Sequence, residues 1–120
     1  MILQDILTEI TDFRDQRDWS QFHSVRNLIA AISVEAGELQ ESVLWKTDDE
    51  VQQLLTSNSR ERLTDELADV LIYALLLTND LGMDPRALIK SKLRKNEQKY
   101  PIELSKGRAT KYTELAVKEK

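Results

Sequence analysis

Residues 65–77 have the sequence DELADVLIYALLL, and this stretch decides the fold. From Val70 to Leu77 every face of a helix would be apolar, so the segment is predicted to be a helix that other helices or another subunit cover. Glu66 and Asp69 stand directly before this run at i,i+3 spacing, which places both carboxylates on one helix face. The sequence therefore predicts acidic side chains at the edge of a buried helix.

A second acidic pair precedes it in residues 35–46, EAGELQESVLWK, where Glu35 and Glu38 have the same spacing. An ionised carboxylate is rarely buried unless it is paired or binds a metal. Oxygen donors without His or Cys suit Mg²⁺, Mn²⁺ or Ca²⁺, and Mg²⁺ is commonly held by carboxylates together with substrate phosphates. The two pairs predict a divalent metal site and phosphate chemistry.

Structural roles for the acidic pairs are also compatible with the sequence. The carboxylates could form ion pairs with Arg26, Lys46 or Arg62, or they could bind a structural cation in a non-catalytic helical module. A di-iron carboxylate bundle is disfavoured, because that design uses Glu-x-x-His on two helices and the chain has a single histidine, His23, in a predicted loop.

The whole chain is expected to be one all-α domain, a four-helix bundle, because 120 residues contain three glycines, two prolines and no persistent strand-like alternation. Main helices are predicted at residues 3–17, 24–46, 58–82 and 85–100, with a short helix around 51–55 and an irregular tail at 102–120. The expected boundary signals are Ser24 as an N-cap, Asn58 with Glu61 as a capping box, Gly82 as a C-terminal residue and Asp84 followed by Pro85.

Composition narrows the class of protein. Seventeen basic and 21 acidic residues give a net charge of −4, which disfavours nucleic acid or an anionic membrane as the main partner. The chain has no cysteine, its first residues do not resemble a signal peptide, and its longest apolar run is far shorter than the roughly 20 residues that span a bilayer. We expect a soluble, cytoplasmic protein.

Several side chains extend the predicted site. Trp45 lies seven residues after Glu38, two turns along the same helix face, and Tyr73 lies four after Asp69. Lys92 and Asn96, four residues apart, could meet phosphate or sugar oxygens.

With these residues in view, the chain resembles the MazG-like superfamily of all-α nucleoside triphosphate pyrophosphohydrolases, whose signature is ExxE, a spacer and ExxD. It is most similar to the dCTP pyrophosphatase branch. Five blocks carry the resemblance: RDWSQFHSVRNL at 17–28, EAGELQESVLWK at 35–46, DELADVLIYAL at 65–75, SKLRKNEQKYP at 91–101 and GRATKYTEL at 107–115.

The resemblance implies a fold of four main helices that assembles as a homotetramer, a dimer of dimers, with active sites at the subunit junctions. It also implies hydrolysis of a nucleoside triphosphate, dCTP or a modified dCTP, to the monophosphate and pyrophosphate. dUTP and non-standard purine triphosphates are the alternative substrates, and a non-catalytic oligomerisation or cation-binding module is the alternative function.

Residue roles follow from the same resemblance. Mg²⁺, with Mn²⁺ as an alternative, is expected on Glu35, Glu38, Glu66 and Asp69, with Glu35 or Glu38 as the catalytic base. Lys92 is expected to contact phosphate and Asn96 the sugar or phosphate. The base pocket is expected to contain Trp19, His23 and Trp45, and Tyr73 is expected to be a further substrate-binding residue.

Overall fold

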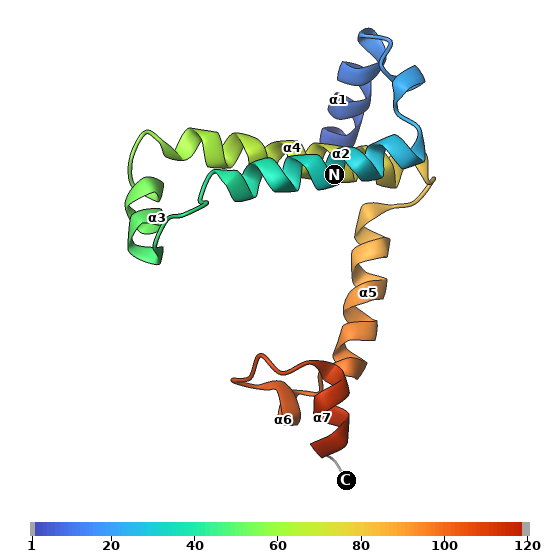
Figure 1. Cartoon of the computed structure of the whole chain (residues 1–120). Helices are drawn as coiled ribbons and strands as arrows, with labels where there is room; N and C mark the ends of the chain where they lie inside the picture. The colour runs from blue at the N-terminus through green and yellow to red at the C-terminus, as the bar shows by residue number, and fades with distance from the viewer. Residues whose placement is uncertain (1, 119–120) are drawn as a thin grey trace. The chain divides into compact units, whose positions relative to one another are not determined.

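The computed structural model describes residues 2–118, and this part of the chain is all-α, without a strand. The helices are α1 (Ile2–Gln16), η1 (Ser20–Phe22), α2 (Val25–Glu41), α3 (Asp48–Leu55), α4 (Arg60–Asp80), α5 (Pro85–Lys99), α6 (Ile102–Ser105) and α7 (Tyr112–Lys118) (Figure 1). They fall into two compact units, Met1–Gly82 and Met83–Lys120, which we describe separately. Within residues 2–118, no helix combines the length and apolar character needed to cross a membrane.

In the first unit, α2 and α4 lie side by side along most of their length, and α3 lies in the connection between them (Figure 1). Helix α1 packs against α4 less extensively. Each of α1, α2 and α4 contributes one large buried apolar side chain, namely Leu7, Leu28 and Leu76. The α2–α4 pair is therefore the framework on which the acidic side chains are placed.

Several predicted helix boundaries are confirmed, each with its physical cause. The Ser24 side chain accepts a hydrogen bond from the Asn27 amide at 3.1 Å, so α2 begins where expected. Asp84 caps α5 in the same way, with Pro85 in the first turn. Gly82 follows α4 with φ of 69°, a left-handed conformation that favours glycine.

The predicted continuation of α2 to Lys46 is wrong. The helix ends at Glu41, where the Ser42 hydroxyl donates to the Leu39 carbonyl at 2.6 Å. Thr47 then begins α3 through a reciprocal capping box with Glu50, at 3.1 and 3.2 Å. Because this cap competes for the backbone that a longer α2 would use, residues 42–46 form a turn, and α3 begins before the expected residue 51.

The capping box predicted from Asn58 and Glu61 is also wrong. Helix α4 begins after Ser59, whose side chain makes no capping hydrogen bond, and the Ser59 amide donates to the Ser57 hydroxyl at 3.2 Å. The preceding turn thus satisfies backbone groups that the sequence pattern assigned to a helix cap.

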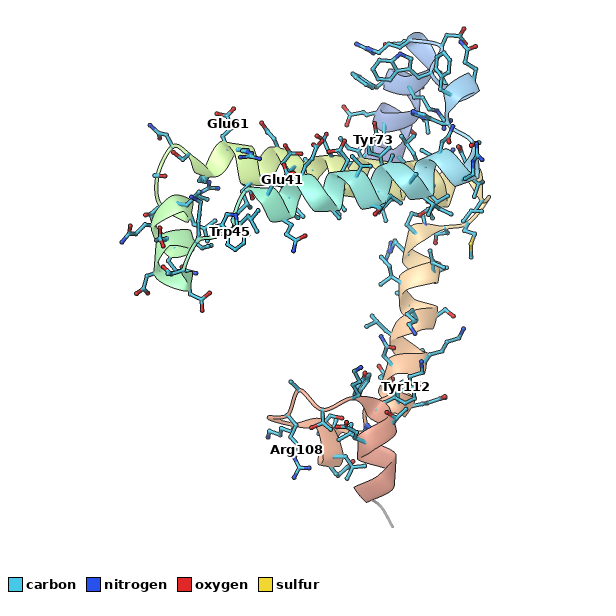
Figure 2. All side chains as sticks on the ribbon, viewed as in Figure 1. Glu41, Trp45, Glu61, Tyr73, Arg108 and Tyr112 are labelled. Atoms are coloured by element: carbon cyan, nitrogen blue, oxygen red, sulfur yellow. The ribbon has the colours of Figure 1, made fainter. Side chains whose placement is uncertain are left out.

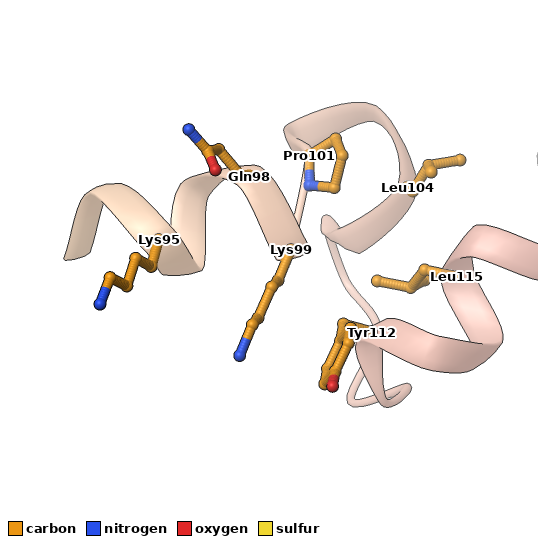
Figure 3. A pocket seen from close by; sticks show the side chains of 7 residues that line it. All are labelled: Lys95, Gln98, Lys99, Pro101, Leu104, Tyr112 and Leu115. Atoms are coloured by element: carbon orange, nitrogen blue, oxygen red, sulfur yellow. The ribbon is translucent and has the colours of Figure 1, made fainter. Parts of the chain in front are cut away.

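The second unit corrects the irregular tail expected at 102–120, since α6 and α7 lie within it. Leu115 on α7 is buried, Tyr112 meets Tyr100 edge to face at 6.2 Å, and the Lys99 ammonium lies 4.7 Å from the Tyr112 ring centre. Lys99, Tyr112 and Leu115 are among the residues that line a cavity of about 410 Å³ in this unit (Figure 3). The prediction failed because these contacts join residues on either side of Gly107. Contacts of this kind do not produce a helical repeat of apolar residues in the sequence.

Candidate active site

The packing of α2 against α4 brings three of the predicted acidic side chains together. Carboxylate oxygens of Glu35, Glu38 and Glu66 all lie within 4.8 Å of one another, and each side chain is half-buried. We call these three residues the acidic centre. Its formation follows from helix geometry, because the i,i+3 spacing puts Glu35 and Glu38 on the face of α2 that meets α4.

The acidic centre is electrostatically uncompensated. The Oε2 atoms of Glu35 and Glu66 are buried and have no hydrogen-bond partner among the described residues. Burial, and then the neighbouring Glu38 carboxylate, raises the pKa of Glu35 to about 7. The pKa of Glu66 is raised by the same two causes in the same order. The raised pKa values mean that Glu35 and Glu66 keep their protons to higher pH than a free glutamate does.

Ion pairing with nearby basic side chains does not neutralise the acidic centre in the described residues. Arg62 forms an ion pair with Glu41 at 3.8 Å, outside the acidic centre, and both side chains are exposed. Arg26 and Lys46 form no ion pair with the acidic centre in residues 2–118.

The donor set fits a hard divalent cation. Three carboxylates from two helices supply only oxygen ligands, and two of their oxygens are buried without a partner in the described chain. A divalent ion would satisfy both oxygens and reverse the unfavourable charge density.

Asp69 is not one of the three close carboxylates, but it lies one turn further along α4 than Glu66. Its charge contributes to the raised pKa values of Glu35, Glu66 and Tyr73. It also lines a cavity of about 430 Å³ beside the acidic centre. Asp69 thus connects the acidic centre to that cavity.

Trp19 and His23, which were expected in the base pocket, line this cavity together with Tyr73, which was expected to bind substrate (Figure 2 labels Tyr73). The rings of His23 and Tyr73 meet edge to face at 6.1 Å. Burial, and then the Arg14 guanidinium, lowers the pKa of His23, so its ring is neutral at pH 7. His23 Nδ1 is buried without a hydrogen-bond partner among the described residues, and it is available to a ligand.

The structure places Trp45 elsewhere, in the segment between α2 and α3 (Figure 2). Because α2 ends at Glu41, Trp45 does not continue the helix face of Glu38. Its backbone has φ of 65° and its side chain is 91% exposed. It does not line the 430 Å³ cavity of its own chain.

Lys92 and Asn96 lie on α5, in the second unit. The Lys92 side chain is exposed, and its pKa is lowered first by the charge of Lys99. Asn96 is half-buried, and its carbonyl accepts a hydrogen bond from the Tyr100 amide at 2.8 Å. The basic face of α5 is thus an anion-attracting surface within its own unit.

Sequence reasoning missed Arg14, which also lines the cavity. Its side chain is buried and donates from Nη1 to both carboxylate oxygens of Asp80, at 3.0 and 2.9 Å. A signal was present, since Arg14 lies seven residues after the buried Leu7 and therefore on the same face of α1.

Residues 30–115 match the MazG-like family. The chain is 46% identical to dCTP pyrophosphatase 1 of Rattus norvegicus over 115 residues, which cover 94% of this chain and 67% of the rat protein. It is 41% identical to dCTP pyrophosphatase 1 of Homo sapiens, with the same coverage.

A solved structure is similar as well. The crystal structure of a pyrophosphatase from Archaeoglobus fulgidus superimposes with a TM-score of 0.77 at 36% identity, covering 84% of this chain and 94% of the archaeal chain. The match in fold extends over most of both proteins.

Proposed function

The chain belongs to the MazG-like family, and from this premise we propose that it is a magnesium-dependent pyrophosphohydrolase that converts dCTP, or a base-modified dCTP, to the monophosphate and pyrophosphate. The observation that carries the proposal is the acidic centre, with two buried carboxylate oxygens that lack a partner among the described residues. The curated relatives supply the substrate class.

The acidic centre and Asp69 would hold the metal. Mg²⁺, when bound, neutralises triphosphate charge and makes the α-phosphorus more electrophilic. Glu35 or Glu38 accepts a proton from the attacking water. The water oxygen bonds to the α-phosphorus, the bond from that phosphorus to the α–β bridging oxygen breaks, and pyrophosphate leaves.

The cavity beside Asp69 would hold the nucleobase. Trp19 offers a flat ring for stacking, while His23 offers a neutral imidazole with an unsatisfied nitrogen. On α5, Lys92 would attract the phosphates and Asn96 would contact the sugar or phosphate, as the resemblance implies.

Assembly as a bundle in a dimer of dimers is part of the same proposal. Large apolar side chains are exposed on both long helices, including Ile29 on α2 and the i,i+4 pair Leu67 and Leu71 on α4. Exposed apolar surface of this kind is typical of an interface. The exposed indole of Trp45 could then enter the cavity of another copy.

The experiment is incubation with dCTP and Mg²⁺ in ¹⁸O-water, with separation of the products. We expect dCMP that carries the label, together with unlabelled pyrophosphate. Label in pyrophosphate would instead locate the attack at the β-phosphorus, and formation of dCDP with orthophosphate would contradict the proposed reaction.

Substrate choice is tested in parallel with dUTP and non-standard purine triphosphates at subsaturating concentration. We expect the highest kcat/KM with dCTP or a modified dCTP. No pyrophosphate release from any triphosphate, with Mn²⁺ binding detected by equilibrium dialysis, would favour the non-catalytic cation-binding module.

A further inference from the structure

The cavity beside Asp69 has two walls that come from different parts of the chain. The arm wall comes from α1 and the segment around η1 and includes Phe13, Arg14, Trp19 and His23, together with Glu9 and Ile10. The α4 wall consists of Asp69, Ile72, Tyr73 and Leu76. We call α1 together with the segment around η1 the arm. The shape of the cavity therefore depends on how firmly this arm is held against α4.

Apolar packing alone holds the arm weakly. Leu7 is the one large apolar side chain of the described part of α1 that is buried, and Phe13 and Ile6 are exposed. Among the described residues, Arg14–Asp80 is the one ion pair between α1 and α4. Both oxygens of Asp80 accept hydrogen bonds from it, so the geometry is well defined.

Arg14 also fixes the start of the arm wall through its backbone. The Trp19 amide donates to the Arg14 carbonyl at 3.1 Å, and the Trp19 ring meets Phe13 edge to face at 5.7 Å. The same residue thus contacts α4 with its side chain and Trp19 with its main chain.

We propose that Arg14 is a positioning residue for the nucleobase: its ion pair with Asp80 fixes the arm wall against the α4 wall. This inference rests on the proposed function, because it assigns the base to the cavity between these walls. The guanidinium is already paired with Asp80 through Nη1 and with Asp15 through Nε, so Arg14 acts on the substrate through the position of Trp19 and His23.

The kinetic test compares Arg14→Met, which keeps most of the side-chain length, with Asp80→Asn. In both variants we expect the KM for dCTP to rise roughly tenfold, within the contribution of stacking on an aromatic ring, while kcat stays close to wild type because the acidic centre is intact. The preference for dCTP over dUTP should fall. Arg62→Gln is the matched control, since it removes the exposed ion pair with Glu41 between α2 and α4.

A second measurement does not depend on activity. In a Trp45→Phe background, Trp19 is the single tryptophan; its side chain is 42% exposed, and acrylamide quenching reports how far packing of the arm wall on α4 shields the remainder. We expect Arg14→Met and Asp80→Asn to increase quenching. The charge swap, Arg14→Asp with Asp80→Arg, should restore both quenching and KM, because it forms the ion pair between α1 and α4 again with the charges exchanged.

Unchanged quenching and unchanged KM in both single variants would overturn the positioning role, even if their thermal stability fell. If Arg14→Met does not fold, Asp80→Asn gives the same decision. Absence of pyrophosphate release by the wild-type protein would overturn the proposed function, whereas the quenching experiment would still decide whether Arg14 holds the arm.

Discussion

Two carboxylates on α4, those of Glu66 and Asp80, have opposite electrostatic environments. Glu66, near the beginning, joins two other carboxylates and has a buried oxygen without a partner in the described chain. Asp80, about 21 Å further along the helix, is neutralised by the buried Arg14. A basic side chain thus pairs with Asp80, whose carboxylate stabilises the fold, whereas none of the described basic side chains forms an ion pair with the three carboxylates of the acidic centre. This difference distinguishes a structural ion pair from a site that awaits an external cation.

Removing a ligand from the acidic centre should have the largest effect on turnover. Glu38→Gln should lower kcat by at least about a hundredfold, because loss of a metal ligand costs more than the 10- to 100-fold typical of outer-shell changes. Helical content measured by circular dichroism should stay unchanged, since the substitution keeps side-chain volume and removes repulsion. Glu41→Gln, one turn beyond Glu38 on α2, is the control and should retain activity, because the Glu41 side chain is exposed and pairs with Arg62 outside the acidic centre. A Glu38→Gln enzyme with near-wild-type turnover would contradict the metal assignment.

Substitution of the two tryptophans should have the next largest effect, on the KM for dCTP. Trp19→Ala should raise the KM for dCTP by roughly one to two decades, since stacking contributes ~1 to 3 kcal/mol per base. Steady-state kinetics with dCTP measure it. Trp45→Ala provides the comparison: a rise of similar size would mean that this indole reaches the cavity of another copy, as the proposed assembly allows. A normal KM in Trp19→Ala would show that the nucleobase does not stack on Trp19 in this cavity.

The pH dependence of stability should report the unfavourable burial of charge in the acidic centre. The pKa of Glu35 is raised from 4.5 to about 7 in the folded protein, so the folded state binds more protons than the unfolded state between these pH values. The free energy of unfolding contributed by Glu35 therefore falls as pH rises through this window. With chelator present, the Tm of wild type relative to Glu35→Gln should decrease from about pH 5 to about pH 7.5. Mg²⁺ at the higher pH should reverse the decrease, and parallel profiles would refute the assignment.

The smallest effect is expected for the exposed pair Arg62 and Glu41. Arg62→Gln should change the free energy of unfolding by less than about 1 kcal/mol, because both side chains are largely in water. Urea denaturation measures this change. A loss of several kcal/mol would show that exposed ion pairs also hold α2 on α4, and the distinction between the two ends of α4 would need to include them.

The acidic centre was predictable from the sequence because it depends on local geometry. The i,i+3 spacing fixes which side chains share a helix face, and two such helices with apolar neighbours have to pack together. The predicted helix position of Trp45 was wrong because it extrapolated a helix face past Glu41, where the Thr47 cap begins another helix. Local competition between two helix ends is not visible in a periodic pattern.

Arg14 was missed for a different reason. Its burial depends on Asp80, 66 positions away in the sequence, and single-sequence patterns do not pair residues over that distance. The helices α6 and α7 were missed similarly, because Leu115 and Tyr112 are stabilised by contacts across a glycine-containing segment. The role of a residue whose partners are distant in the sequence is recognised only in the three-dimensional structure.

The sparse core has a consequence for how this protein responds to dilution. Of the large apolar side chains described, only Leu7, Leu28, Leu76 and Leu115 are buried within one chain. If association covers the exposed apolar side chains, mass action ties the folded population to the number of chains per unit volume. Tm should then rise with protein concentration, and specific activity should decline on extended dilution. Concentration itself would act as a regulator of this enzyme.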